Sequence, residues 1–344
     1  MAKKIITFLL LTAMTGGCVT NPQTFSPAWW CRGANQQTIL SVPLRPVRFV
    51  RVERQRWETP DGDFIDVDWL PGAPGTPILI VLHGLEGSSR SRYALSMLAA
   101  AENEGWRGLA INYRGCSGEP NRLLRSYHGG ETSDLTWVVQ KISAENPGSP
   151  IVLVGASLGA NILLKYLGEQ GDNLPLSVRG GVAISAPFDL ARSAEALEHG
   201  FARMYMNRLV KSMKAKAKIK LKMFPGSFDE KKLDAVKTLT DIDNLVTGPI
   251  HGFRDAADYR SHSSSIKFLG GIRRPVLLIS AKDDPFFPGE YLPVAEVAAN
   301  HFLTAEFTDH GGHVGFLTGW VPGWPGSWIE QRTILFLKKS IQPC

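Results

Sequence analysis

The feature that most constrains the fold is a serine set between glycines where one hydrophobic pattern gives way to another. Residues 151–154 form a continuous apolar run, as in a strand buried on both faces, and residues 158–168 repeat apolar side chains at helical spacing. Between them, residues 155–159 read GxSxG with Ser157 at the centre. A sharp strand-to-helix turn of this kind exposes the serine hydroxyl at the carboxyl edge of a sheet. We therefore predict that Ser157 is a nucleophile.

Similar apolar runs recur along the chain and alternate with helical patterns. Strands are expected at residues 78–82, 108–111, 151–154, 181–184 and 276–279, and helices at residues 93–104, 133–144 and 158–168. This alternation predicts an α/β fold with a mainly parallel sheet flanked by helices. Before it, the alternating patterns at residues 47–57 and 64–70 are separated by turn residues and predict an N-terminal antiparallel hairpin.

The pattern divides the chain into three parts. Residues 1–17 resemble the signal peptide of a bacterial lipoprotein, with Cys18 as the first mature residue and the site of lipidation. An N-terminal extension follows at residues 19–45, and a catalytic domain is expected at residues 46–340. Inside this domain the strand pattern stops at about residues 188–271, which predicts an inserted helical cap. The expected location is the bacterial cell envelope, facing the periplasm, with the cytoplasm as the alternative.

A serine nucleophile needs a general base and a carboxylate that orients the base. Where a strand-to-helix turn presents the serine, the chain order is serine, acid, histidine. Asp284 follows the strand expected at residues 276–279 and is the predicted acid, with Asp283 as the alternative. His313 lies in a glycine-rich loop late in the chain and is the predicted base, with His310 as the alternative.

A tetrahedral intermediate also needs two backbone N–H donors for its oxyanion. We predict that one belongs to Leu158, directly after the nucleophile. The other is expected from Leu85, in the loop after the strand at residues 78–82. His83 in the same loop is expected to shape it, without a catalytic role.

Positive charge is concentrated in the expected cap. The formal net charge is +6, and eight basic residues with no acidic residue among them lie between Arg203 and Lys222. Apolar residues recur there at helical spacing, so the segment predicts an amphipathic helix. Its basic face is either a solvated surface or a surface that contacts anionic lipid. No nucleic-acid-binding motif is present, so no nucleic acid partner is expected.

The four cysteines are Cys18, Cys31, Cys116 and Cys344. A bridge between Cys31 and Cys344 is compatible with an oxidising compartment, and Cys116 is expected to be a packing residue. The chain has no CxxC or HExxH signature. No metal ion and no other cofactor is therefore expected.

Several of these segments together resemble the YheT-like α/β-hydrolases (AB hydrolase family 4), which are related to plant embryogenesis-associated hydrolases and mammalian abhydrolase-domain lipases. The resemblance is carried by Gln37-Thr38, HGLEGSSRSRY (83–93), NYRGCSG (112–118), YHGGETSDL (127–135), GASLGAN (155–161), AKDDPFFP (281–288) and GGHVGF (311–316). It implies the α/β-hydrolase fold and a Ser157–Asp284–His313 triad. It also implies hydrolysis of carboxylic esters, including acylglycerols or phospholipids.

The leading hypothesis is a serine hydrolase that cleaves lipid or short-chain acyl esters, including monoacylglycerol-like ones, through an acyl-enzyme. The same triad would serve an amidase, a peptidase or an acyltransferase. A non-catalytic envelope lipoprotein is the alternative from a different class. The expected partners are a small ester or lipid substrate and a membrane surface. The protein would contact the membrane through the lipid anchor. If the basic face of the cap helix contacts anionic lipid, the segment from Arg203 to Lys222 would contact the membrane as well.

Overall fold

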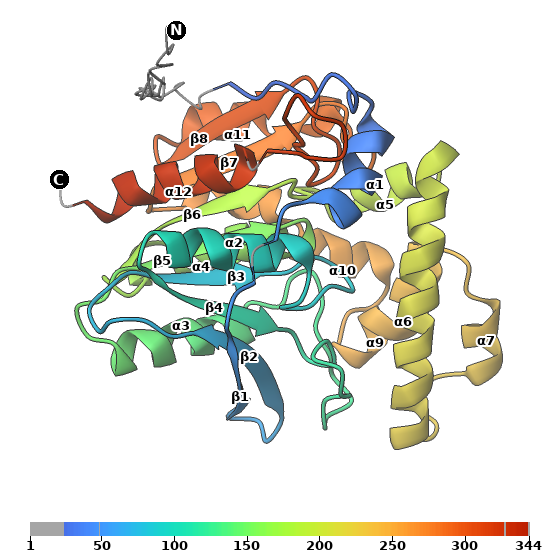
Figure 1. Ribbon diagram of the computed structural model, residues 1–344. Helices are drawn as coiled ribbons and strands as arrows, with labels where there is room; N and C mark the ends of the chain where they lie inside the picture. Colours follow the sequence, from blue (N-terminus) through green and yellow to red (C-terminus); the bar gives the residue numbers. More distant parts are fainter. Residues whose placement is uncertain (1–23, 48, 327, 343–344) are drawn as a thin grey trace, which may run out of the picture.

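The computed structural model describes residues 24–47, 49–326 and 328–342. These residues form one eight-stranded sheet with helices on both faces (Figure 1). The strands are β1 (Glu53–Glu58), β2 (Phe64–Leu70), β3 (Ile78–Leu82), β4 (Arg107–Asn112), β5 (Ile151–Ala156), β6 (Val178–Ile184), β7 (Val276–Ala281) and β8 (Leu303–Thr308). Their spatial order is β1-β2-β4-β3-β5-β6-β7-β8. The α/β class expected from the alternating pattern is confirmed.

The sheet is parallel except at its N-terminal edge. β1 pairs antiparallel with β2, and β2 pairs antiparallel with β4, whereas all pairs from β4 to β8 are parallel. The hairpin is therefore present, but its first strand starts at Glu53 instead of residue 47. The physical reason is the partner strand: Glu53 already faces Trp69, one residue before β2 ends, so an earlier residue would find almost no partner.

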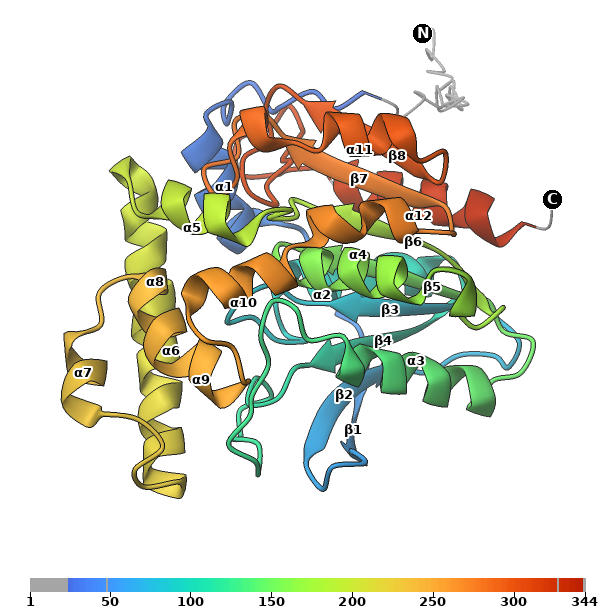
Figure 2. The same ribbon diagram turned by 180° about the vertical axis from the view of Figure 1, so that it is seen from behind.

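Two layers of helices cover the sheet, one on each face (Figure 1, and Figure 2 from behind). One layer contains α2 (Arg92–Asn103) and α12 (Trp328–Ile341), and the other contains α3 (Ser133–Glu145) and α4 (Leu158–Gln170). Short elements near the second layer and the β8 edge are η1 (Gly171–Asn173), η5 (Gly289–Tyr291) and α11 (Val294–Ala299).

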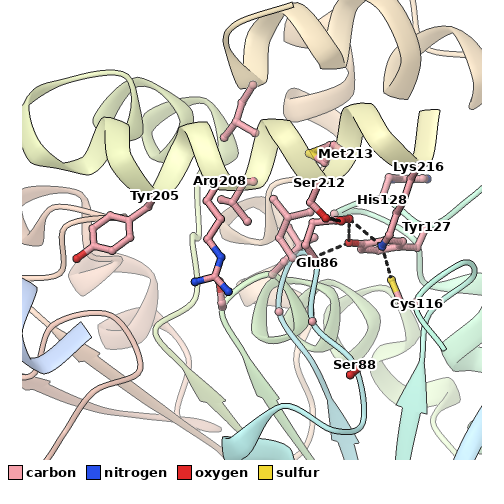
Figure 3. Close-up of a pocket in the computed structure, with 18 of the residues that line it drawn as sticks. Glu86, Ser88, Cys116, Tyr127, His128, Tyr205, Arg208, Ser212, Met213 and Lys216 are labelled. Carbon is pink, nitrogen blue, oxygen red and sulfur yellow. Dashed lines mark hydrogen bonds and ion pairs between the residues drawn. The ribbon is translucent and has the colours of Figure 1, made fainter. Parts of the chain in front are cut away.

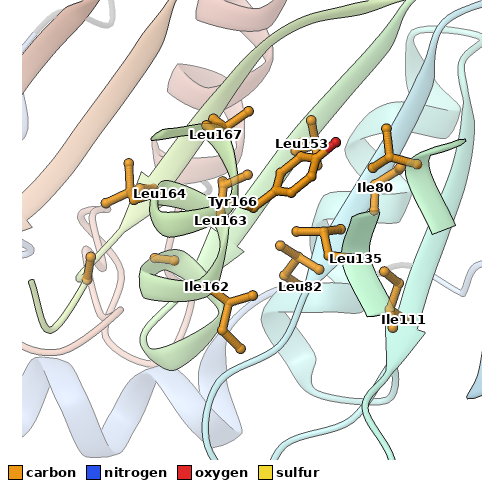
Figure 4. Close-up of a cluster of buried hydrophobic side chains, with 14 of the residues drawn as sticks. Ile80, Leu82, Ile111, Leu135, Leu153, Ile162, Leu163, Leu164, Tyr166 and Leu167 are labelled. Carbon is orange, nitrogen blue, oxygen red and sulfur yellow. The ribbon is translucent and has the colours of Figure 1, made fainter. Parts of the chain in front are cut away.

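The core between α4 and the central strands consists of large aliphatic side chains (Figure 4). Leu153 on β5 and Ile80 on β3 are fully buried there, together with Ile162 and Leu163 on α4. Because apolar area removed from water stabilises the fold by about 25 cal/mol per Å², this layer holds β5 and α4 firmly in place. The turn that joins them is therefore rigid.

The chain between β6 and β7 contains no strand among the described residues and forms helices beyond the carboxyl ends of the parallel strands (Figure 1). Its elements are α5 (Leu190–Leu197), η2 (Gly200–Ala202), α6 (Arg203–Met223), α7 (Glu230–Ala235), α8 (Leu239–Ile242), η3 (Asp243–Thr247), α9 (Gly248–Ile250), α10 (Ala256–Ser263) and η4 (Ser265–Gly271). The elements from α5 to η3 enclose a hydrophobic cluster of their own. η4 packs instead against α4 and belongs to the helical layer on the sheet.

One further helix, α1 (Ala34–Leu44), precedes the sheet and lies near the loop that follows β8. In the described part of the chain, no helix combines the length and apolar character needed to cross a membrane. The expected signal peptide, the lipidation site Cys18 and the bridge partner Cys344 lie outside the described residues. Cys31 is fully buried.

Candidate active site

Ser157 lies in the turn between β5 and α4, with backbone angles of φ 54° and ψ −126°. A positive φ is costly for a non-glycine residue, so it persists only where the surroundings enforce it. The backbone is closely packed on both sides of the serine: a Cβ at Gly155 would lie 2.4 Å from the carbonyl oxygen of Gly159, and a Cβ at Gly159 would lie 2.5 Å from that of Leu82. The two glycines of the GxSxG sequence let the backbone close this turn.

His313 connects the serine with a carboxylate. The Ser157 hydroxyl lies 2.9 Å from Nε2 of His313, and Nδ1 of the same ring lies 2.9 Å from Oδ2 of Asp284. Asp284 and His313 are 4% and 9% exposed, so water has little access to the contact between them. The three predicted catalytic side chains, which come from the ends of β5, β7 and β8, are thus brought into one hydrogen-bonded row.

The two alternatives take other positions. Asp283 accepts a hydrogen bond of 2.9 Å from the Gly312 N–H and lies 3.2 Å from Nδ1 of His310. The His310 side chain is 55% exposed. Asp283 therefore holds the backbone of the histidine loop, and His310 lies at the surface of that loop.

The imidazole of His313 is held on one face by Phe286. The two rings are stacked at 4.0 Å between centroids and 4° between planes. The Phe286 N–H donates to Asp284 Oδ1 at 2.7 Å, so one residue packs on the histidine and hydrogen-bonds the acid. Phe286 is part of the quoted AKDDPFFP segment, but its stacking position requires the folded loop.

The loop after β3 approaches the serine closely. A Cβ at Gly84 would lie 3.0 Å from Cβ of Ser157, so a larger residue would crowd the serine. Leu85 and Leu158, the predicted oxyanion donors, both line the same cavity as Ser157. Leu158 is the first residue of α4, where a backbone N–H has no acceptor within the helix. His83 accepts from the Tyr113 N–H, and burial lowers the pKa of His83 to about 4, so it is neutral.

Helix α1 also holds the loop that carries His313, a role that the sequence did not predict. The Thr38 hydroxyl accepts a hydrogen bond of 2.9 Å from the His313 N–H. Gln37 is fully buried, and its amide pairs with both backbone groups of Leu317, at 2.6 and 3.1 Å. In the sequence, the only sign of this role is that Gln37-Thr38 is one of the segments that resemble the YheT-like family.

The site opens into a cavity of about 1210 Å³ beneath the cap. Its walls come from α1, the loop after β3, the crossover after β4 and the cap helix α6. Apolar side chains form much of the wall; they include Ile39, Leu190, Leu197, Met213 and Ile250. Such a space accommodates an apolar chain next to the serine.

A polar cluster ties α6 to the loop after β3 (Figure 3). The Glu86 carboxylate accepts from Lys216 Nζ at 3.0 Å, from the Tyr127 hydroxyl at 3.0 Å and from the Ser212 hydroxyl. Glu86 directly follows Leu85, so the cap helix braces a predicted oxyanion donor. Cys116 lies 3.2 Å from Lys216 Nζ, and burial raises the pKa of its thiol, which keeps it protonated.

Part of the basic segment on α6 contacts other residues of the protein. Lys214 Nζ donates to the carbonyl oxygen of Asp234 at 2.8 Å, Lys218 pairs with the Asp234 carboxylate at 2.7 Å, and Lys220 donates 2.7 Å to the Asn121 carbonyl. With Lys216 on Glu86, four of the eight cations have protein partners. Exposed cations without such partners among the described residues include Arg203, Lys211 and Lys222. A contact of this surface with anionic lipid stays a prediction.

Comparison with known proteins agrees with the α/β fold and with the family resemblance of the sequence. Residues 77–319 match a family model described as alpha/beta hydrolase fold. The "Putative esterase YheT" of Escherichia coli (strain K12) is 41% identical over 283 residues, which cover 81% of this chain and 82% of that protein. "Phospholipase ABHD3" of Mus musculus is 29% identical over 311 residues, which cover 88% and 75%.

Among solved structures, an esterase of Pyrococcus furiosus, Pf2001, superposes with a TM-score of 0.54 at 19% identity. The superposition covers 85% of this chain and 92% of that one. At this level of identity the likeness concerns the fold alone.

Proposed function

This chain belongs to the alpha/beta hydrolase fold family, in its YheT-like branch, and is a carboxylic ester hydrolase; from that premise we propose that it works through a Ser157–His313–Asp284 triad and an acyl-enzyme. The observation that carries the proposal is the double contact of His313, with 2.9 Å to the Ser157 hydroxyl and 2.9 Å to the Asp284 carboxylate. These are the contacts that a general base and its orienting acid need.

In the proposed reaction, His313 removes the Ser157 proton while the oxygen attacks the acyl carbonyl. Asp284 holds the Nδ1–H of the ring and stabilises the imidazolium that forms. The backbone N–H groups of Leu85 and Leu158 receive the developing oxyanion. His313 then protonates the leaving alcohol, and water, activated by the same ring, releases the acid.

The substrate class we propose is an acyl ester of a lipid or a short-chain alcohol, including monoacylglycerol-like esters. The apolar wall of the cavity supports this, because it offers an acyl chain a place next to the serine. The names of the two relatives, an esterase and a phospholipase, point to the same chemistry in those proteins.

The direct test combines covalent labelling with hydrolysis. The wild-type chain should react with a fluorophosphonate probe and hydrolyse a series of para-nitrophenyl esters. Ser157→Ala should lose labelling, and its kcat should fall by about 10⁴-fold or more. Ser143→Ala, on α3 and outside the cavity, is the matched control and should behave as wild type. Retained labelling or activity in Ser157→Ala would refute the mechanism.

We also propose that the protein is a membrane-attached lipoprotein, acylated at Cys18 and facing the periplasm. The signal-like residues 1–17 support the proposal. A second support lies near the point where the described chain begins, at residue 24: Trp29 is 57% exposed, and Trp320 and Trp324 are 86% and 80% exposed. Trp29 Nε1 donates to the Trp320 backbone carbonyl at 2.9 Å, so these two residues lie next to each other on the surface. Exposed tryptophans are typical of the membrane–water interface.

A further inference from the structure

One charged side chain of the cavity is not used by the mechanism proposed above. Arg208 on α6 is exposed to solvent and lines the cavity that contains Ser157 and His313. Its guanidinium points from α6 toward the sheet (Figure 3). A substrate that enters this cavity therefore passes close to a positive charge.

The helix positions Arg208 between two parts of the active site. Tyr205, one turn earlier, packs at 4.9 Å from Phe286, which stacks on His313. Ser212, one turn later, donates to Glu86, the residue that follows Leu85. Since a helix rises about 1.5 Å per residue, these two contacts lie about 10 Å apart along α6, with Arg208 near the middle. Arg208 thus faces the region between the base and the predicted oxyanion loop.

The other ionisable groups around the cavity are already engaged. Examples are the pairs Arg45–Glu330, Lys216–Glu86, Arg114–Asp134, Glu119–Arg56 and Arg260–Asp243, and Lys220 with its carbonyl partners. For Arg208 no hydrogen bond or ion pair is found within the described residues. Its five N–H donors are available to a ligand.

We propose that Arg208 binds an anionic group of the ester substrate, a carboxylate or a phosphate, and so makes the enzyme selective for negatively charged esters. This rests on the proposed function, because the anion is part of the same molecule that Ser157 attacks. A guanidinium presents a planar fork that matches two oxygens of either anion.

The test compares matched neutral and anionic esters. If the anion is on the acyl part, the pair is para-nitrophenyl hexanoate and mono-para-nitrophenyl adipate. If it is on the alcohol part, the pair is hexanoyl glycerol and hexanoyl glycerol phosphate. Arg208→Gln should lower kcat/KM for at least one anionic ester by about tenfold or more, with the neutral partner changed less than about twofold. Arg208→Lys should restore part of the difference.

The matched control is Lys211→Gln, which removes the same charge from the same helix outside this cavity. It should leave the ratio of anionic to neutral turnover as in wild type. An equal loss for neutral and anionic esters in Arg208→Gln, or no loss for either anionic ester, would overturn the proposal. Hydrolysis of the neutral esters by the wild type tests the proposed function separately, so the two failures are distinguishable.

Discussion

At the residue scale, unusual backbone angles are concentrated around the candidate site. Five non-glycine residues of the described chain have positive φ: Glu86, Ser157, Ser185, Val314 and Phe316. Ser157 is the proposed nucleophile, Glu86 follows a predicted oxyanion donor, and Val314 and Phe316 follow the proposed base. Ser185 accepts from the Val314 N–H at 3.0 Å. Left-handed backbone costs about 1–3 kcal/mol at such residues, so the surrounding packing maintains a strained arrangement at the site.

The first prediction separates the two neighbouring aspartates. Asp284→Asn should reduce kcat by about a thousandfold or more, since an amide cannot stabilise the imidazolium of His313. Asp283→Asn should change kcat by no more than about threefold, because its side-chain oxygen still accepts from the Gly312 N–H. Steady-state ester hydrolysis by both purified variants decides this. If Asp283→Asn proves the more damaging change, the assignment of the acid is wrong.

At the element scale, two helices outside the central layers hold the site together. α6 reaches the loop after β3 through Lys216 and Ser212, which both contact Glu86. α1 reaches the loop after β8 through Gln37 and Thr38. Neither helix supplies a proposed catalytic group, but each fixes the backbone beside one.

The second prediction concerns α1. Thr38→Val keeps the side-chain shape but leaves the buried His313 N–H without an acceptor. We expect kcat to fall by about tenfold through misplacement of the imidazole, with little change in KM. Kinetics of the variant, with thermal unfolding as a check on folding, measure the effect. Thr38→Ser retains the hydroxyl and should recover most of the activity; failure of that rescue would count against the positioning role.

At the scale of the whole molecule, an ionic cluster with a buried centre joins segments that are distant in the sequence. Arg114, after β4, contacts Asp61 and Asp63 from the hairpin turn at 2.9 and 3.0 Å, and Asp134 from α3 at 2.6 Å. Burial opposes the charge on Asp61, but its hydrogen bonds with Thr59 and Arg114 prevail and lower its pKa to about 2. Arg114, Asp63 and Asp134 are buried, so loss of one of them would leave a buried charge without its partner, which is strongly destabilising. Asp61 lies at the exposed edge of the cluster.

The third prediction follows from the sign of that shift. Because the pKa of Asp61 is lower in the folded chain than the ordinary value of 3.8, its contribution to stability is present above that value. The contribution should disappear as the pH falls to about 2. Asp61→Asn should therefore unfold at a lower temperature than wild type at neutral pH, and the gap in Tm should shrink from about pH 4 downward. A gap that stays constant across this range would contradict the assignment.

The fourth prediction concerns attachment of the whole molecule to a membrane. Expressed from the full sequence in a bacterium, the protein should incorporate a palmitate analogue and sediment with membranes, because an acylated Cys18 adds apolar chains that partition into lipid. Cys18→Ser should lose the label. Cys31→Ser is the matched control, since Cys31 is fully buried, and it should be labelled as wild type. A Cys18→Ser protein that still carries the label would exclude acylation at this position.

The sequence by itself determined the elements and the order of the site residues. β2, β3 and the start of α4 fall where the apolar periodicity placed them, because side-chain spacing reports directly on strand and helix geometry. The GxSxG turn was equally readable, because its motif is local and Gly155 is required by a contact with nearby Gly159. The contact that requires Gly159 is with the backbone of Leu82, which is distant in the sequence.

Only the tertiary structure decided which groups meet. Thr38 contacts His313 across 275 residues of sequence, and Lys216 contacts Glu86 across 130. No local pattern encodes such pairs, because they depend on how the cap and α1 pack on the finished sheet. The same holds for the cations of α6, where helical periodicity shows an amphipathic face. It does not show that Lys220 turns inward to backbone carbonyls while Arg208 remains free above the active site.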